Sequence, residues 1–128
     1  MNEEKEYYVF VYGTLLTGER NGQWAAGAKR TPATAYGTLY DTHCGYPALV
    51  QEGSTLIKGE ILLTDEAGLK QMDRLEGYPN FYRRETIEAT LTLTGKKIAA
   101  LAYIMNRLPQ DASVISNRDW RHREMGVK

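Results

Sequence analysis

One segment of the chain has the pattern of a regular helix, whereas its surroundings have the pattern of short strands. Between Asp65, a suitable N-cap, and Gly77, a suitable stop, the apolar residues recur at helical spacing; they are Leu69, Met72 and Leu75. We therefore predict a helix over residues 65–76. The other apolar runs are short, rich in β-branched and aromatic residues, and bounded by turn residues, which predicts strands. This combination favours a small, mostly β barrel that carries one or two helices.

The predicted strands follow one another at close spacing. They cover residues 7–11, 33–41, 48–50, 56–63, 86–93 and 98–105. In the run from 86 to 93, Ile, Ala and Leu alternate with Thr and Glu, which predicts one buried and one solvated face. Thr94-Gly95-Lys96 predicts a turn, so the last two strands should form a hairpin. The segment 21–30, around Trp24, predicts a short helix or a structured loop.

The composition is that of one folded unit. The chain has 128 residues, 42% hydrophobic and 25% charged, which predicts a single domain over residues 1–128. Sixteen basic and sixteen acidic residues give no net charge, so we expect neither a nucleic-acid nor a membrane partner. The tail over residues 107–128 is rich in charge and offers only Trp120 as an apolar anchor. We expect this tail to be partly flexible, with its basic residues on a surface element packed through the Trp.

Cysteine and histidine are too scarce for several kinds of site. Cys44 is the one cysteine, which excludes an internal disulfide and multi-cysteine metal sites, and His43 and His122 are the two histidines. We therefore expect neither a metal nor a cofactor. Neighbours in an extended chain point to opposite faces, so we interpret Cys44 beside His43 as structural. The N-terminus is acidic and no apolar stretch approaches about 20 residues, which predicts a cytoplasmic protein.

The first predicted strand ends abruptly in Tyr12-Gly13-Thr14-Leu15. Glycine at such a point lets the backbone approach a ligand closely or adopt a conformation that other residues resist. The amides that follow can then point outward as hydrogen-bond donors, which suits a carboxylate or a carbonyl oxygen. The alternative is an ordinary tight turn at the end of an edge strand.

Glu76 occupies an unusual place on the predicted helix. It is the last residue before Gly77, at the edge of the apolar stripe, so its carboxylate should lie close to the core. The negative end of the helix dipole and desolvation would both raise the pKa of Glu76, toward what a general base near neutral pH requires. The alternative is a solvated glutamate paired with Arg74, Arg83 or Arg84.

Four motifs spread over nearly the whole chain belong together. They are Val11-Tyr12-Gly13-Thr14-Leu15, Gly45-Tyr46-Pro47-Ala48, the stretch 72–79 (MDRLEGYP) and Tyr82-Arg83-Arg84. With them the chain resembles the γ-glutamylcyclotransferase-like family, in its small AIG2-like, γ-glutamylamine cyclotransferase branch. The resemblance implies an α+β, mostly β fold: a small mixed β-barrel of about six to seven strands with flanking helices. It also implies that Tyr12, Gly13, Thr14 and Leu15 hold a γ-glutamyl group and that Glu76 is the catalytic acid/base.

Tyr82 and Tyr103 are further candidates, because they lie on predicted strands beside the helix and in the last hairpin. Their phenols could bond Glu76 or a substrate. Tyrosine is common in strands, and this chain has nine, so a purely structural place is the alternative. We assign them a secondary role in substrate binding.

The leading hypothesis is an enzyme that cyclises a γ-glutamyl amide or amine to 5-oxoproline and releases the free amine. The alternatives are a barrel that binds a small carboxylate or amino acid without turnover, and an interaction module with an aromatic surface. The expected partner is a small γ-glutamyl substrate, and we expect a monomer or a weak homo-oligomer. The sequence leaves open whether the leaving group is an amino acid, an amine or polyamine, an isopeptide or a natural product.

Overall fold

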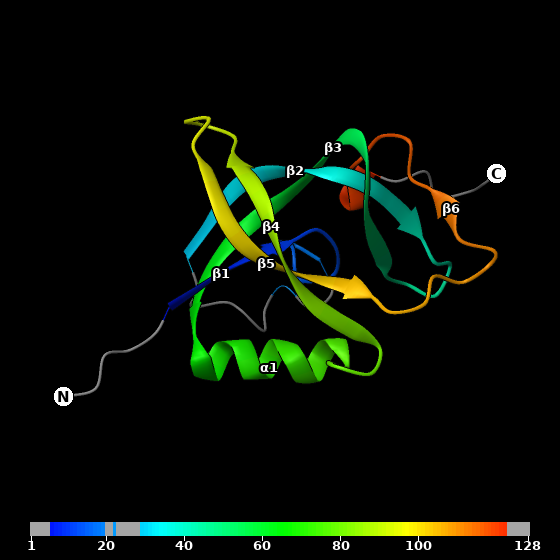
Figure 1. Cartoon of the computed structure of the whole chain (residues 1–128), viewed down its shortest axis with the longest axis horizontal. Helices are drawn as coiled ribbons and strands as arrows, with labels where there is room; N and C mark the ends of the chain where they lie inside the picture. Colours follow the sequence, from blue (N-terminus) through cyan, green and yellow to red (C-terminus); the bar gives the residue numbers. More distant parts are fainter. Residues whose placement is uncertain (1–5, 20–21, 23–28, 123–128) are drawn as a thin grey trace.

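Five strands close into a barrel, and a helix lies along one side of it in the computed structural model (Figure 1). The structure describes residues 6–19, 22 and 29–122. Its elements are β1 (Glu6–Val11), β2 (Lys29–Asp41), β3 (Pro47–Asp65), α1 (Glu66–Glu76), β4 (Tyr82–Leu91), β5 (Lys97–Met105), β6 (Ser113–Val114) and a 3₁₀ turn (Trp120–His122). Within these described ranges, no helix is long and apolar enough to cross a membrane.

The strand order closes on itself. Neighbouring strands run β3-β1-β5-β4-β2, and β2 pairs back onto β3 to complete the ring, with β6 added outside β2. β1 and β5 are parallel, whereas the other pairs are antiparallel. The predicted small mixed barrel is therefore confirmed. The predicted hairpin is also present, since β4 and β5 pair from Tyr82↔Met105 to Thr90↔Lys97.

Two predicted strands prove to be one. Residues 48–50 and 56–63 both belong to β3, a single strand of 19 residues that pairs along the length of β2. The register shifts between Gly37 and Thr38, whose partners are Thr55 and Val50, and Gly53 adopts a φ of 116° there. The prediction was wrong because this irregularity places exposed polar residues in mid-strand, which interrupts the apolar pattern. The predicted segment 21–30 lies mostly outside the described residues, but Lys29 and Arg30 belong to β2.

The predicted helix is confirmed, and it begins one residue later than expected. Asp65 is the N-cap itself, and its Oδ1 accepts a hydrogen bond from the Gly68 amide at 2.8 Å. Gly77 ends the helix in the left-handed conformation, with φ of 68°, and its amide donates to the Arg74 carbonyl. Leu69 and Met72 are buried against the barrel. The cap at Gly77 fixes where Glu76 lies.

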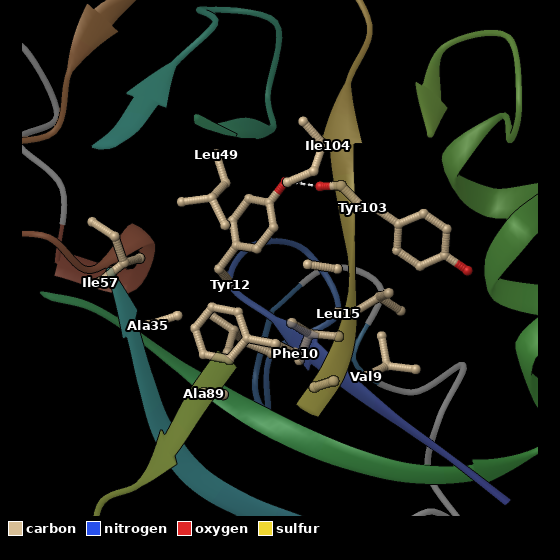
Figure 2. Close-up of a cluster of buried hydrophobic side chains, with 14 of the residues drawn as sticks. Val9, Phe10, Tyr12, Leu15, Ala35, Leu49, Ile57, Ala89, Tyr103 and Ile104 are labelled. Atoms are coloured by element: carbon tan, nitrogen blue, oxygen red, sulfur yellow. Dashed lines mark hydrogen bonds between the residues drawn. The ribbon is translucent and has the colours of Figure 1, made fainter. Parts of the chain in front are cut away.

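The barrel interior is filled by aliphatic and aromatic side chains. Phe10 and Tyr12 lie inside it with Leu49, Ile57 and several alanines, as Figure 2 shows. Both rings come from the first strand and the loop that follows it, where they stack at 6.3 Å between centroids. Leu93, in contrast, was expected on a buried face but is 82% exposed in the turn after β4. The buried positions of Phe10 and Tyr12 show that β1 and the loop after it contribute directly to the core.

The described part of the tail packs on the barrel. Trp120 is 2% exposed, which confirms it as an anchor, but Ile115 is buried too, so Trp120 is not the only one. Val114 pairs with Tyr40, and the Lys58 amide donates to the Arg118 carbonyl at 2.9 Å. The tail therefore contacts β2 at Val114 and β3 at Arg118. The expected flexibility of residues 107–128 stays a prediction.

Candidate active site

The loop after β1 is buried rather than exposed. Tyr12, Thr14 and Leu15 are each less than 9% exposed, and the Leu16 amide donates to the Gly13 carbonyl at 3.0 Å. A Cβ atom on Gly13 would lie 2.5 Å from Cγ of Pro47. The close approach that this glycine permits is therefore to the first residue of β3, and it brings two of the sequence motifs together.

A small pocket opens beside this loop, and we call it the inner pocket. All seven residues predicted for binding or catalysis line it, although they come from the β1 loop, α1, β4 and β5. The described lining residues are Phe10, Val11, Tyr12, Gly13, Thr14, Leu15, Tyr46, Pro47, Glu76, Tyr82 and Tyr103. The edge-strand part of the alternative is wrong, because β1 lies between β3 and β5 inside the ring, although the loop does make a tight turn between Gly13 and Leu16.

Glu76 is the one acidic residue among those that line the inner pocket in the described part of the chain. It is half-buried, at the last position of α1. Burial raises the pKa of Tyr12 well above its ordinary value, and the charge of Glu76 raises it further. Burial likewise raises the pKa values of Tyr82 and Tyr103, with smaller contributions from neighbours that include Glu76. These three phenols, which line the pocket with Glu76, therefore remain protonated and neutral.

The three phenol groups donate their hydrogen bonds to the protein. Tyr12 donates to the Tyr103 carbonyl, the contact drawn in Figure 2, and Tyr82 donates to the Pro47 carbonyl at 2.7 Å. The Tyr103 ring points away from Tyr12, toward α1, where its hydroxyl donates to Asp73 Oδ1 at 2.7 Å. The proton of each phenol is thus committed to a protein acceptor. Substrate binding by Tyr82 and Tyr103 stays a prediction.

Asp73 connects the last turn of α1 to the barrel. Besides the Tyr103 hydroxyl, its Oδ1 has Arg84 Nε at 3.3 Å, and the Arg84 guanidinium lies 4.2 Å from the centre of the Tyr78 ring. Arg83 pairs instead with Glu85 at 2.7 Å. Two of the three arginines that the sequence offered as partners for Glu76 are therefore paired with other carboxylates.

Sequence reasoning missed a buried ion pair behind the loop. Glu60 is 8% exposed, and its Oε1 accepts from Arg30 Nη1 at 2.7 Å and from the Thr17 amide at 3.0 Å. Arg30 Nη1 also donates to the Leu15 carbonyl at 2.9 Å. The pair therefore holds both ends of the segment 15–17. A glutamate amid the apolar residues of β3 was the only local signal, because its partner lies 30 positions away.

We expect Glu60→Gln to lower the free energy of unfolding by about 2 kcal/mol at neutral pH, because Arg30 loses a buried charged partner. Burial alone would raise the pKa of Glu60, but hydrogen bonds from Thr17 and Arg30 outweigh it and hold the pKa below its ordinary 4.5. The charged form therefore stabilises the fold above that pH, and its contribution is lost as the pH falls through the folded pKa.

Urea unfolding between pH 7 and pH 3 checks this prediction. The stability difference between the native protein and Glu60→Gln should shrink as the pH falls below about 4.5, since only the native protein loses the charge of Glu60. Glu88→Gln is the matched control, because Glu88 is exposed on β4. A difference that stays constant over the whole range would contradict the role assigned to the Glu60 charge.

Two known proteins are similar to this chain in sequence over most of its length. A protein of Vibrio cholerae, provisionally named a γ-glutamylcyclotransferase, is 38% identical over 124 residues, which is 92% of this chain and 98% of that protein. The γ-L-glutamyl-butirosin B γ-glutamyl cyclotransferase of Niallia circulans is 36% identical over 105 residues, which is 77% of this chain and 67% of that enzyme.

Solved structures agree on the fold. YkqA from Bacillus subtilis superposes with a TM-score of 0.74 at 29% identity; the match covers 91% of this chain but only 40% of YkqA. A mouse AIG2-like protein gives a TM-score of 0.65 at 22% identity, over 79% of this chain and 78% of that one. The family model described as "Gamma-glutamyl cyclotransferase, AIG2-like" matches residues 9–122. The chain therefore belongs to the AIG2-like γ-glutamyl cyclotransferase family of enzymes.

Proposed function

We propose that this protein cyclises a γ-glutamyl amide or amine to 5-oxoproline and releases the free amine, with Glu76 as general base and then general acid. One observation carries the proposal: Glu76 and the loop Tyr12–Leu15 line the same small pocket, although they lie more than 60 positions apart in the chain.

The reaction supplies its own nucleophile. The α-amine of the γ-glutamyl group attacks the γ-carbonyl carbon, a C–N bond closes the five-membered lactam, and the amide C–N bond to the leaving group breaks. The pocket need only hold the glutamyl chain in a folded form in which amine and carbonyl meet. Glu76 takes a proton from the attacking amine and returns it to the leaving nitrogen, so the carboxylate is unchanged after each turnover.

The surroundings of Glu76 favour this proton transfer. The neighbouring phenols are neutral, so no second negative charge from them competes for the substrate ammonium. The backbone of Gly13 to Leu15 forms part of the same wall, and amides in such a loop suit the α-carboxylate or the developing oxyanion. The Arg30–Glu60 pair supports this wall from behind. The name of the Niallia circulans relative supports the same reaction class.

Release of 5-oxoproline from γ-glutamyl amides tests the proposal. The purified protein should form 5-oxoproline and free amine from at least one member of a panel that varies the leaving group among amino acids, simple amines, polyamines and ε-lysine. Heat-inactivated protein provides the background of spontaneous cyclisation. Thermal stabilisation by the panel without any 5-oxoproline would instead favour a barrel that binds its ligand and does not turn it over.

A further inference from the structure

A second pocket adjoins the inner one and shares Glu76 with it. This outer pocket is an open hollow between the end of α1 and the loop before β3. Four residues line both pockets: Thr14, Tyr46, Glu76 and Tyr82. The outer pocket therefore adjoins the inner one at Glu76.

If the proposed function holds, the two pockets bind different parts of the substrate. The inner pocket contains the backbone of Gly13, which suits the glutamyl group, whereas the outer pocket does not. Glu76 must reach both the attacking amine and the leaving nitrogen, so the bond that breaks lies beside it. The substituent on the leaving nitrogen then extends into the outer pocket.

The outer pocket combines an aromatic wall with one cation. Tyr46 and Phe81 meet edge to face, with ring centroids 5.6 Å apart, and Phe81 remains 46% exposed. Arg74 is exposed, and apart from Glu76 it is the one charged residue in this wall among the described residues. Its side chain makes neither an ion pair nor a hydrogen bond within the described ranges, whereas Arg30 and Arg84 pair with carboxylates.

A cation in the last turn of a helix also stabilises the helix dipole, which would account for Arg74 without a ligand. The dipole does not explain why this guanidinium borders a hollow that also holds the catalytic carboxylate. In an amino-acid leaving group the α-carboxylate is separated from the scissile nitrogen by one carbon atom, so it would enter the hollow that Arg74 and Glu76 both line. A polyamine would instead bring a free ammonium toward Arg74, which opposes binding.

We propose that the outer pocket binds the amino-acid leaving group of a γ-glutamyl amino acid, with Arg74 on its carboxylate and Tyr46 and Phe81 against an apolar side chain. Arg74 is thus a specificity residue that contacts the substrate in a position remote from the bond that breaks. Such a contact contributes equally to ground-state and transition-state binding, so its loss should change KM and leave kcat unchanged.

Two matched ligands measure how much the carboxylate of the leaving group contributes to binding. γ-Glutamyl-L-phenylalanine and γ-glutamyl-phenethylamine share the glutamyl group and the phenyl ring, and differ only in the carboxylate on the leaving group. Titration calorimetry in the Glu76→Gln background measures binding without turnover. We expect the phenylalanine ligand to bind about tenfold more tightly than the phenethylamine ligand, because it makes one additional charge-assisted contact. Adding Arg74→Gln to the Glu76→Gln variant should remove this difference in affinity, because that contact is lost.

The control is Arg83→Gln, which removes an arginine from β4 that lies outside both pockets. It should leave the preference intact, and thermal melting confirms that each variant is folded. The proposal would be overturned if the two ligands bound equally, if γ-glutamyl-phenethylamine bound more tightly, or if neither ligand bound. A preference for the phenylalanine ligand that survives Arg74→Gln would also overturn it. Turnover is measured separately in the native protein: failure to form 5-oxoproline from any γ-glutamyl amide counts against the proposed function, whatever the ligands show in the binding assay.

Discussion

Glu76→Gln should abolish 5-oxoproline formation while leaving the fold and ligand binding in place. Glutamine has the size of glutamate but cannot accept and return a proton, and general acid-base catalysis contributes about 10²–10⁴-fold to rate. We therefore expect kcat to fall by at least about 100-fold. Because Glu76 is only half-buried at the end of α1, the melting temperature should change little. Steady-state kinetics on the best substrate, together with thermal melting, measures both effects.

Glu66→Gln provides the matched control. It makes the same chemical change on the same helix, but in the exposed first turn and away from both pockets. Its activity should stay within about twofold of native, and its stability should fall by no more than about 1 kcal/mol through the helix dipole. Substantial activity in Glu76→Gln would show that another group transfers the proton, and the proposed mechanism would be wrong.

Gly13→Ala should damage activity through the shape of the loop. The new Cβ would lie 2.5 Å from Cγ and 2.7 Å from Cδ of Pro47, so the loop or β3 must move. Overpacking of this kind costs about 1–3 kcal/mol of stability. A displacement near 1 Å in groups that position a substrate can lower activity about 100-fold. We expect both losses, measured by urea unfolding and by 5-oxoproline release.

Combining Pro47→Ala with Gly13→Ala tests whether the contact with Pro47 causes these losses. Pro47→Ala removes the Cγ and Cδ atoms that the new Cβ would meet, while the backbone carbonyl that accepts the Tyr82 hydrogen bond remains. The double variant should therefore be more active and more stable than the sum of the single changes predicts. Strictly additive losses would mean that Gly13 matters for a reason other than its contact with Pro47.

The helix and most of the barrel could be predicted from local sequence because their signals are local. Asp65 and Gly77 cap the helix, and short β-branched runs mark the strands. The extent of β3 could not be predicted in this way, because the irregularity around Gly53 arises from a shift in the pairing with β2. The apolar runs at 48–50 and 56–63 indicate two strands as long as their common partner is unknown.

The candidate site could likewise be predicted only in part from local sequence. Glu76 and the loop Tyr12–Leu15 were found because each carries an abrupt change in pattern, and the structure brings them into one pocket. The contact between Gly13 and Pro47, the Arg30–Glu60 pair and the shared pocket of Arg74 and Tyr46 all join distant segments. No local pattern predicts such contacts, because the residues become neighbours only when the barrel closes.

The reaction class itself is tested most directly by running turnover in water enriched in ¹⁸O and weighing the products by mass spectrometry. Intramolecular attack by the α-amine uses no water, so the account predicts unlabelled 5-oxoproline in equal amount with the free amine. Glutamate that carries ¹⁸O in its γ-carboxylate would show hydrolysis by an attacking water molecule. That result would contradict cyclisation and the role assigned to the pocket around Glu76.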